Sequence, residues 1–79
     1  TREYSDEKRR EISIRQSAYR VFTRIADILN DLDDLYMDVK RLQYLVEDSG
    51  LNVDDLFRYI SEASNQLKKV YDQISEMMK

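Results

Sequence analysis

Apolar residues recur at alternating steps of four and three along the segment from Ile14 to Val46. Steps of this kind place one continuous stripe on a helix, as in coiled coils. Phe22, Leu29 and Tyr36 run beside the stripe at intervals of seven, so it is wider than a two-stranded coiled coil needs and is typical of a bundle helix. The ten stripe positions, none of them polar, are Ile14, Ala18, Val21, Ile25, Ile28, Leu32, Leu35, Val39, Leu42 and Val46.

A second stripe follows the same rule closer to the end of the chain. Phe57, Tyr71 and Met78 widen it, and Ser64 interrupts this flanking row. The pattern therefore predicts two amphipathic helices, each of which needs more than one neighbour. The second stripe consists of Val53, Leu56, Ile60, Ala63, Leu67, Val70, Ile74 and Met77.

The two stripes are joined by VEDSGLNVDDL, which holds the only glycine of a chain without proline. We expect Gly50 to end the first helix in the left-handed conformation, with Val46 and Leu51 in contact across the ending. Asn52 is predicted to cap the second helix, its side chain accepting from an otherwise unpaired backbone N–H. So short a turn makes the two helices antiparallel, and the sequence predicts a helical hairpin.

The whole chain, residues 1–79, is predicted to be a single all-α domain. The first helix is expected over about 6–49, beginning after Ser5, with a turn at 50–52 and a second helix over about 53–78. The alternative is a three-helix bundle with a break near Asn30, because residues 30–34 are poor helix formers. One long helix is favoured, since the stripe crosses this segment without a phase change.

A chain of 79 residues buries a modest core and needs a further source of stability. It has no Cys or His, which excludes disulfides and a His/Cys metal site and leaves self-association. The second helix is expected to cover the first only from about Thr23 to Ser49. We therefore expect two hairpins to dimerise into a four-helix bundle, with a tetramer left open, through Ile14, Ala18, Val21, Phe22, Ile25 and Ile28.

Charge is distributed in a way that favours an antiparallel homodimer. Residues 1–24 carry seven Lys/Arg against four Asp/Glu, residues 25–50 two against seven, and residues 51–79 four against five. An antiparallel twin brings the basic start of the first helix against its acidic middle, around a two-fold axis near Ile25 and Ile28. The acidic residues concerned are Asp27, Asp31, Asp34 and Asp38.

The sequence is also compatible with partners other than a second copy. A small dimeric regulator would use the basic start of the chain to bind nucleic acid phosphates. Another protein would dock on exposed Met37, Tyr44 and Tyr59. The stripe of four aspartates is compatible with Mg²⁺ or Ca²⁺, although a solvated acidic face is the simpler interpretation. The candidate nucleic-acid contacts are Arg9, Arg10, Arg15, Arg20 and Arg24.

The composition argues against catalysis, because the usual general bases and nucleophiles, His and Cys, are missing. We expect no catalytic residue, no metal and no cofactor. No apolar run approaches the roughly 20 residues of a membrane span and no secretion signal is evident, so a cytoplasmic or other intracellular location without membrane binding is expected. The function predicted from sequence is an oligomerisation or protein–protein interaction module.

Overall fold

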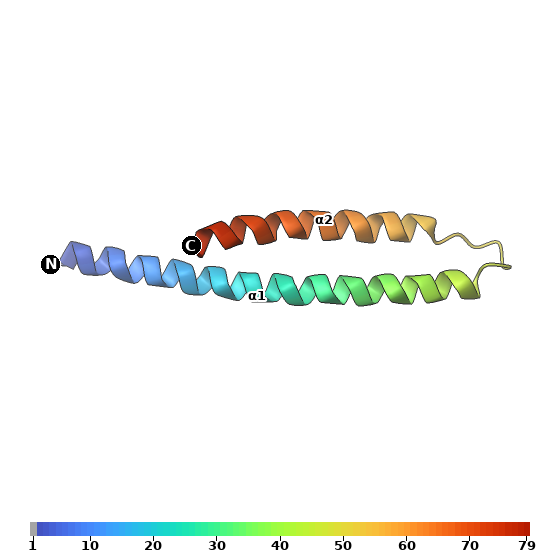
Figure 1. Cartoon of the computed structure of the whole chain (residues 1–79), viewed down its shortest axis with the longest axis horizontal. Helices are drawn as coiled ribbons and strands as arrows, with labels where there is room; N and C mark the ends of the chain where they lie inside the picture. Colours follow the sequence, from blue (N-terminus) through green and yellow to red (C-terminus); the bar gives the residue numbers. More distant parts are fainter. Residues whose placement is uncertain (1) are drawn as a thin grey trace.

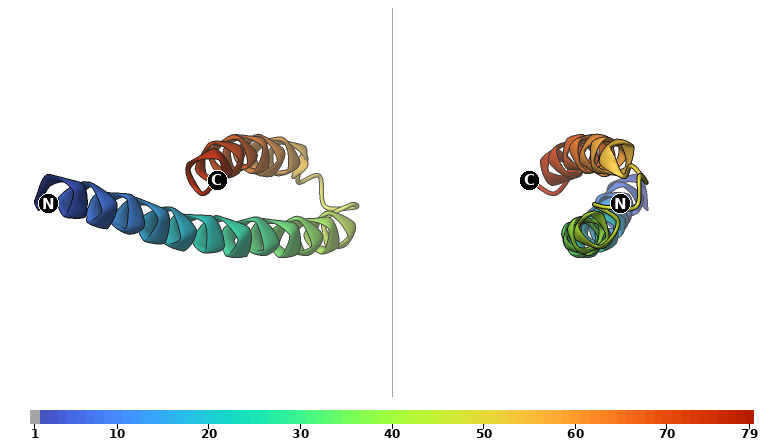
Figure 2. Two further views of the ribbon diagram at one scale, coloured as in Figure 1. Left: turned by 60° about the vertical axis from the view of Figure 1, so that its left-hand side comes forward. Right: turned by 90° about the vertical axis from the view of Figure 1, so that its right-hand side faces the viewer.

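The computed structural model describes residues 2–79, with side chains described from Ser5 onward. It contains two α-helices, α1 (Arg2–Leu45) and α2 (Asp54–Met77), and no strand within the described residues. The helices lie side by side and antiparallel, with α1 extending past the end of α2 (Figures 1 and 2). The molecule measures 72 × 15 × 14 Å between Cα atoms. The predicted all-α helical hairpin is confirmed.

Helix α1 is unbroken along its 44 residues. It runs through Asn30 without interruption, so the three-helix alternative is wrong. Buried Ile25 and Val39 lie on either side of the suspected break and hold both halves of α1 against α2. The helix begins at Arg2, so Ser5 lies inside it rather than at its cap, and it ends at Leu45, four residues before the expected end.

The connection between the helices, residues 46–53, contains the predicted left-handed glycine. Gly50 has φ 81°. Val46 and Leu51, predicted to be in contact, both line a hollow beside the connection. The N–H and Oγ–H of Ser49 both donate to the Val46 carbonyl, at 3.0 and 2.7 Å. The Leu51 N–H donates to Ser49 Oγ at 3.2 Å, so the Ser49 hydroxyl links the end of α1 to the connection.

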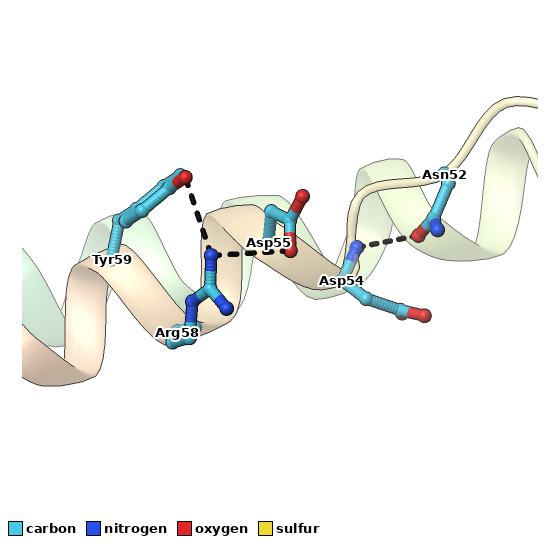
Figure 3. Close-up of polar contacts among 5 residues, drawn as sticks. All are labelled: Asn52, Asp54, Asp55, Arg58 and Tyr59. Atoms are coloured by element: carbon cyan, nitrogen blue, oxygen red, sulfur yellow. Dashed lines mark hydrogen bonds and ion pairs between the residues drawn. The ribbon is translucent and has the colours of Figure 1, made fainter.

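The N-cap position of α2 is Val53, one residue later than the predicted Asn52, and it has no side-chain capping bond. Asn52 still makes the predicted kind of bond at the start of the helix, because its Oδ1 accepts from the N–H of Asp54 at 2.8 Å (Figure 3). Asp54 and Asp55 place negative charge at the positive end of the helix dipole. Gln43 Nε2 donates to Asp54 Oδ1 at 3.4 Å and links the start of α2 to α1.

Two aromatic contacts define how the helices are aligned. Phe22 packs on Tyr71 with ring centroids 4.6 Å apart, and Tyr36 packs edge-on to Phe57 at 5.1 Å. Both pairs obey one antiparallel register, because the step from Phe22 to Tyr36 along α1 equals the step from Tyr71 back to Phe57 along α2. In this register Ile28 is level with Asn65 in the middle of α2.

Helix α2 covers α1 from a point about two turns nearer the start of the chain than the expected Thr23. The connection folds back along the end of α1 (Figure 1). In the register set by the aromatic pairs, α2 therefore starts level with Val39 rather than with Ser49. As a result Met77, the last residue of α2, is level with Gln16. The part of α1 that extends beyond α2 is therefore shorter than expected and comprises the residues before about Ile14.

The core between the two helices is small. Among the described side chains, four apolar ones are buried: Ala18 and Ile25 at 5% exposure, Val39 at 7% and Val53 at 8%. None of the large side chains is completely enclosed. Two helices with so little shared core are marginally stable by themselves, because helical stability in proteins comes mainly from the packing of an apolar face.

Replacing Gly50 should weaken the fold through the backbone alone. A Cβ at this position meets no atom within 4 Å, so the cost arises from the positive φ, which costs most L-residues about 1–2 kcal/mol. We expect Gly50→Ala to lower the free energy of unfolding by about that amount. Gly50→Asn should lose less, because asparagine tolerates this conformation. Urea unfolding followed by circular dichroism at one protein concentration measures both, and equal stability of the three proteins would contradict the assignment.

Candidate protein-interaction face

The apolar stripe of each helix consists of three parallel rows, and the hairpin covers two of them. The middle rows face each other and include the buried core residues. A second row, with Phe22 and Tyr36 on α1 and Tyr71 and Phe57 on α2, closes one side of the seam through the aromatic pairs. Ser64, which interrupts the row on α2, is level with Leu29 in the same register, and both are half-buried.

The third row of each helix is left open to solvent. Its members recur at intervals of seven, and their large side chains are 41–56% exposed, while Ala63 is exposed as well. We call the two rows together the apolar face. It comprises Ile14, Val21, Ile28, Leu35 and Leu42 on α1 and Leu56, Ala63, Val70 and Met77 on α2.

Both open rows lie on the same side of the hairpin. In an antiparallel pair, each third row is displaced from the seam toward the same side, opposite the aromatic rows. A hollow of about 380 Å³ confirms this at one end, because Ile14 and Val21 of α1 line it together with Ile74 and Met77 of α2. The aromatic side is polar by comparison, and its hollow is lined by Asp33, Ser61, Ser64, Asn65 and Lys68, with Leu32, Tyr36 and Ile60 beneath.

The six predicted self-association residues divide between the face and the core. Ile14, Val21 and Ile28 belong to the apolar face. Ala18 and Ile25 are buried against α2, and Phe22 stacks on Tyr71, so these three side chains are used inside the hairpin. The expectation that Ala18 faces water is wrong, because α2 reaches further along α1 than the turn position suggested. The remaining members of the face were not among the candidates, and their spacing of seven was the signal that would have found them.

Charged residues line the outer edge of the apolar face on α1. Helix geometry places there the residues three positions after, and one position before, each member of the row. These side chains are exposed, and among the described side chains none of them forms an ion pair within the hairpin. Over residues 20–38 they change from basic to acidic near the middle of the helix, and Arg41, before Leu42, is basic again. We call the residues at this edge from 20 to 38 the charged flank: Arg20, Arg24, Asp27, Asp31, Asp34 and Asp38.

The candidate nucleic-acid contacts all lie on the exposed surface of α1 but do not gather on one face. Arg10 borders the apolar hollow beside Ile14. Arg15 and Arg20, with Gln16 and Tyr19, line a separate hollow of about 450 Å³. By helical periodicity, Arg9, Arg20 and Arg24 lie on one side of α1, because they are eleven and four residues apart, and Arg15 points to another side. All five arginines are exposed.

The three candidate docking residues are exposed but are not brought together. Met37 and Tyr44, at 58% and 78% exposure, lie one above the other on the back of α1. Tyr59 lies on α2 at 55% exposure. The Arg58 guanidinium lies over the Tyr59 ring, with Cζ 5.1 Å from the ring centroid. Its Nη2 donates to the Tyr59 hydroxyl at 3.3 Å and forms an ion pair with Asp55 at 3.5 Å (Figure 3).

Within the part of the chain that the structure describes, no group of three or more Asp, Glu, His or Cys side chains is placed to hold a metal ion. The aspartate stripe of Asp27, Asp31, Asp34 and Asp38 forms no such group. Neither described helix has the combination of length and apolar character that crossing a membrane requires.

Comparison with known protein families finds no matching family model, and comparison with curated proteins and with solved structures finds no match either.

Proposed function

We propose that the chain is an oligomerisation module whose apolar face packs against the same face of a second copy. Two hairpins joined in this way form a four-helix bundle. The observation that carries the proposal is a continuous apolar face along both helices of a hairpin in which, from Ser5 onward, four side chains are buried. Ile14, Val21 and Ile28, expected from sequence to mediate self-association, form the α1 half of this face together with Leu35 and Leu42.

The energetics favour association. Burying one large aliphatic side chain is worth roughly 1.5–3 kcal/mol, so a half-exposed one gains about 1 kcal/mol when covered. Eight such side chains on each of two copies give about 16 kcal/mol, which is as large as the upper end of the ~4–15 kcal/mol that association costs. An open apolar row along both helices is also unusual for a monomer, since extended exposed apolar patches mark interaction sites.

A bundle of this kind leaves a polar outer surface for further partners. The aromatic side of each hairpin, with Asp33, Asn65 and Lys68, faces outward, as do Met37 and Tyr44 on the back of α1. These exposed side chains would be the contact surface for another protein in a larger scaffold or regulatory assembly. Self-association is thus the basic activity, and docking of a different protein is secondary to it.

The first test places a charge on the apolar face. Val21→Asp should convert the dimer to a monomer, because a carboxylate cannot be buried among aliphatic side chains without a partner. The matched control is Ile12→Asp, which changes an apolar residue of similar exposure, 49% against 41%, on the opposite side of α1. Ile12→Asp should keep the wild-type mass in sedimentation equilibrium. A wild-type monomer at micromolar concentration would refute the proposal, as would equal effects of the two substitutions.

Stability should also depend on protein concentration. If association completes the core, mass action raises the melting temperature as the protein becomes more concentrated. A tenfold increase in concentration adds about 1.4 kcal/mol per dimer to the stability of the folded state. Circular dichroism melts over a hundredfold concentration range measure this shift. A melting temperature that stays constant over that range would mean that each hairpin folds independently of a second copy.

Nucleic-acid binding is the second candidate, and the hollow formed by Arg15, Gln16, Tyr19 and Arg20 favours it. It predicts an affinity for DNA or RNA that falls with salt, with a log–log slope of about −0.9 per phosphate contact on duplex DNA. We expect a pure self-association module to show no such binding. Fluorescence anisotropy with a labelled duplex and a labelled single strand, at increasing salt, distinguishes the two functions. Arg15→Glu should abolish any binding that uses this hollow.

A further inference from the structure

We infer that the two copies stack with α1 antiparallel on α1 and α2 antiparallel on α2, around a two-fold axis that passes beside Ile28. The inference rests on the proposed self-association and adds the orientation and register of the second copy. It follows from the pairing register of the hairpin and from the order of charges on the charged flank.

Two symmetric arrangements can bury the apolar face completely. If the two-fold axis lies across the helices, α1 of one copy covers α1 of the other, running in the opposite direction. If the axis lies along the helices, α1 of one copy covers α2 of the other. The apolar rows fit both arrangements equally, so the charged residues beside the rows determine which arrangement is favoured.

The axis across the helices brings opposite charges together. With the axis beside Ile28, the flank of α1 faces the same flank of the second copy in reverse order. Arg24 then lies opposite Asp31 of the second copy, and Arg20 lies opposite Asp34 of the second copy. Symmetry repeats each pair. Symmetry also places Asp27 beside Asp27 of the second copy at the axis, which is a like-charged contact. Exposed ion pairs are weak one by one, about 0–1 kcal/mol, but four of them acting together outweigh this contact and favour the orientation.

The axis along the helices brings like charges together. In that arrangement the level of each residue is fixed by the register already seen within the hairpin. Asp38 would be level with Asp55 of the second copy, and Asp31 with Glu62. The third pair at this edge, Arg24 with Lys69, is like-charged too. Such pairs repel at the edge of an interface, so this arrangement is disfavoured.

The position of the axis agrees with the open row of α1 and with the length of α2. Ile28 is the middle member of its row, which runs from Ile14 to Leu42. It is also level with Asn65, which lies at the centre of α2 (Asp54–Met77). An axis at this point therefore centres the open row of α1 on its own copy and α2 on α2 at the same time. The start of α1, before about residue 11, extends beyond this overlap.

Single cysteines test the arrangement, because the chain has no cysteine of its own. Asp27→Cys introduces a thiol on the charged flank beside the axis, outside the apolar face. Asp38→Cys is the matched control: it removes the same charge from the same flank, but the two copies of residue 38 lie about 30 Å apart along the helix, at 1.5 Å per residue. A short bis-maleimide should link the Asp27→Cys protein into a covalent dimer and leave the Asp38→Cys protein unlinked.

Light scattering on the same two proteins separates the possible outcomes. Dimeric mass with linkage at position 27 alone supports the inferred arrangement. Dimeric mass with no linkage at either position, or with linkage at both, overturns the arrangement while self-association stands. Monomeric mass for both variants and for the wild-type protein overturns self-association itself, and the inferred arrangement with it.

Discussion

The structure depends on a mismatch between the width of the apolar stripes and the number of helices available to cover them. Each stripe consists of three rows, and one neighbouring helix covers the middle row and one flank. The aromatic rows are the flank that the hairpin covers, since Phe22 meets Tyr71 and Tyr36 meets Phe57. The aliphatic rows remain, and their position on one side gives the hairpin an apolar face and a polar face.

This division makes folding and assembly difficult to separate. The described side chains that the hairpin buries are few, and two of them, Val39 and Val53, lie close to the connection. The far end of the seam relies on Ala18, Ile25 and the ring of Phe22. Covering the aliphatic rows would enclose eight large half-exposed side chains of each copy, so the second copy would contribute a large share of the core.

Much of the fold was predictable because local rules agree with one another. The stripe periodicity gave two helices, Gly50 has the predicted left-handed conformation, and Asn52 accepts the predicted capping bond. The register was not predictable, because it depends on how the eight-residue connection folds back, and that path is influenced by the Ser49 hydroxyl. The residues of the apolar face were also not fully predictable from the sequence. In sequence Ala18 and Val21 are equivalent stripe positions, and only the rotation of α1 about its own axis shows that one is buried and the other is open.

The elongated shape of the hairpin affects how its assemblies move in solution. Helix α1 sets the 72 Å length, while the other two dimensions are 15 and 14 Å. A second copy laid along the first would thicken this rod far more than it would lengthen it. Mass would double while frictional drag increased only modestly, so a pair would diffuse almost as fast as one molecule. A narrow rod also has a larger drag than a sphere of equal mass, and its elution from a sizing column would overstate its molecular weight.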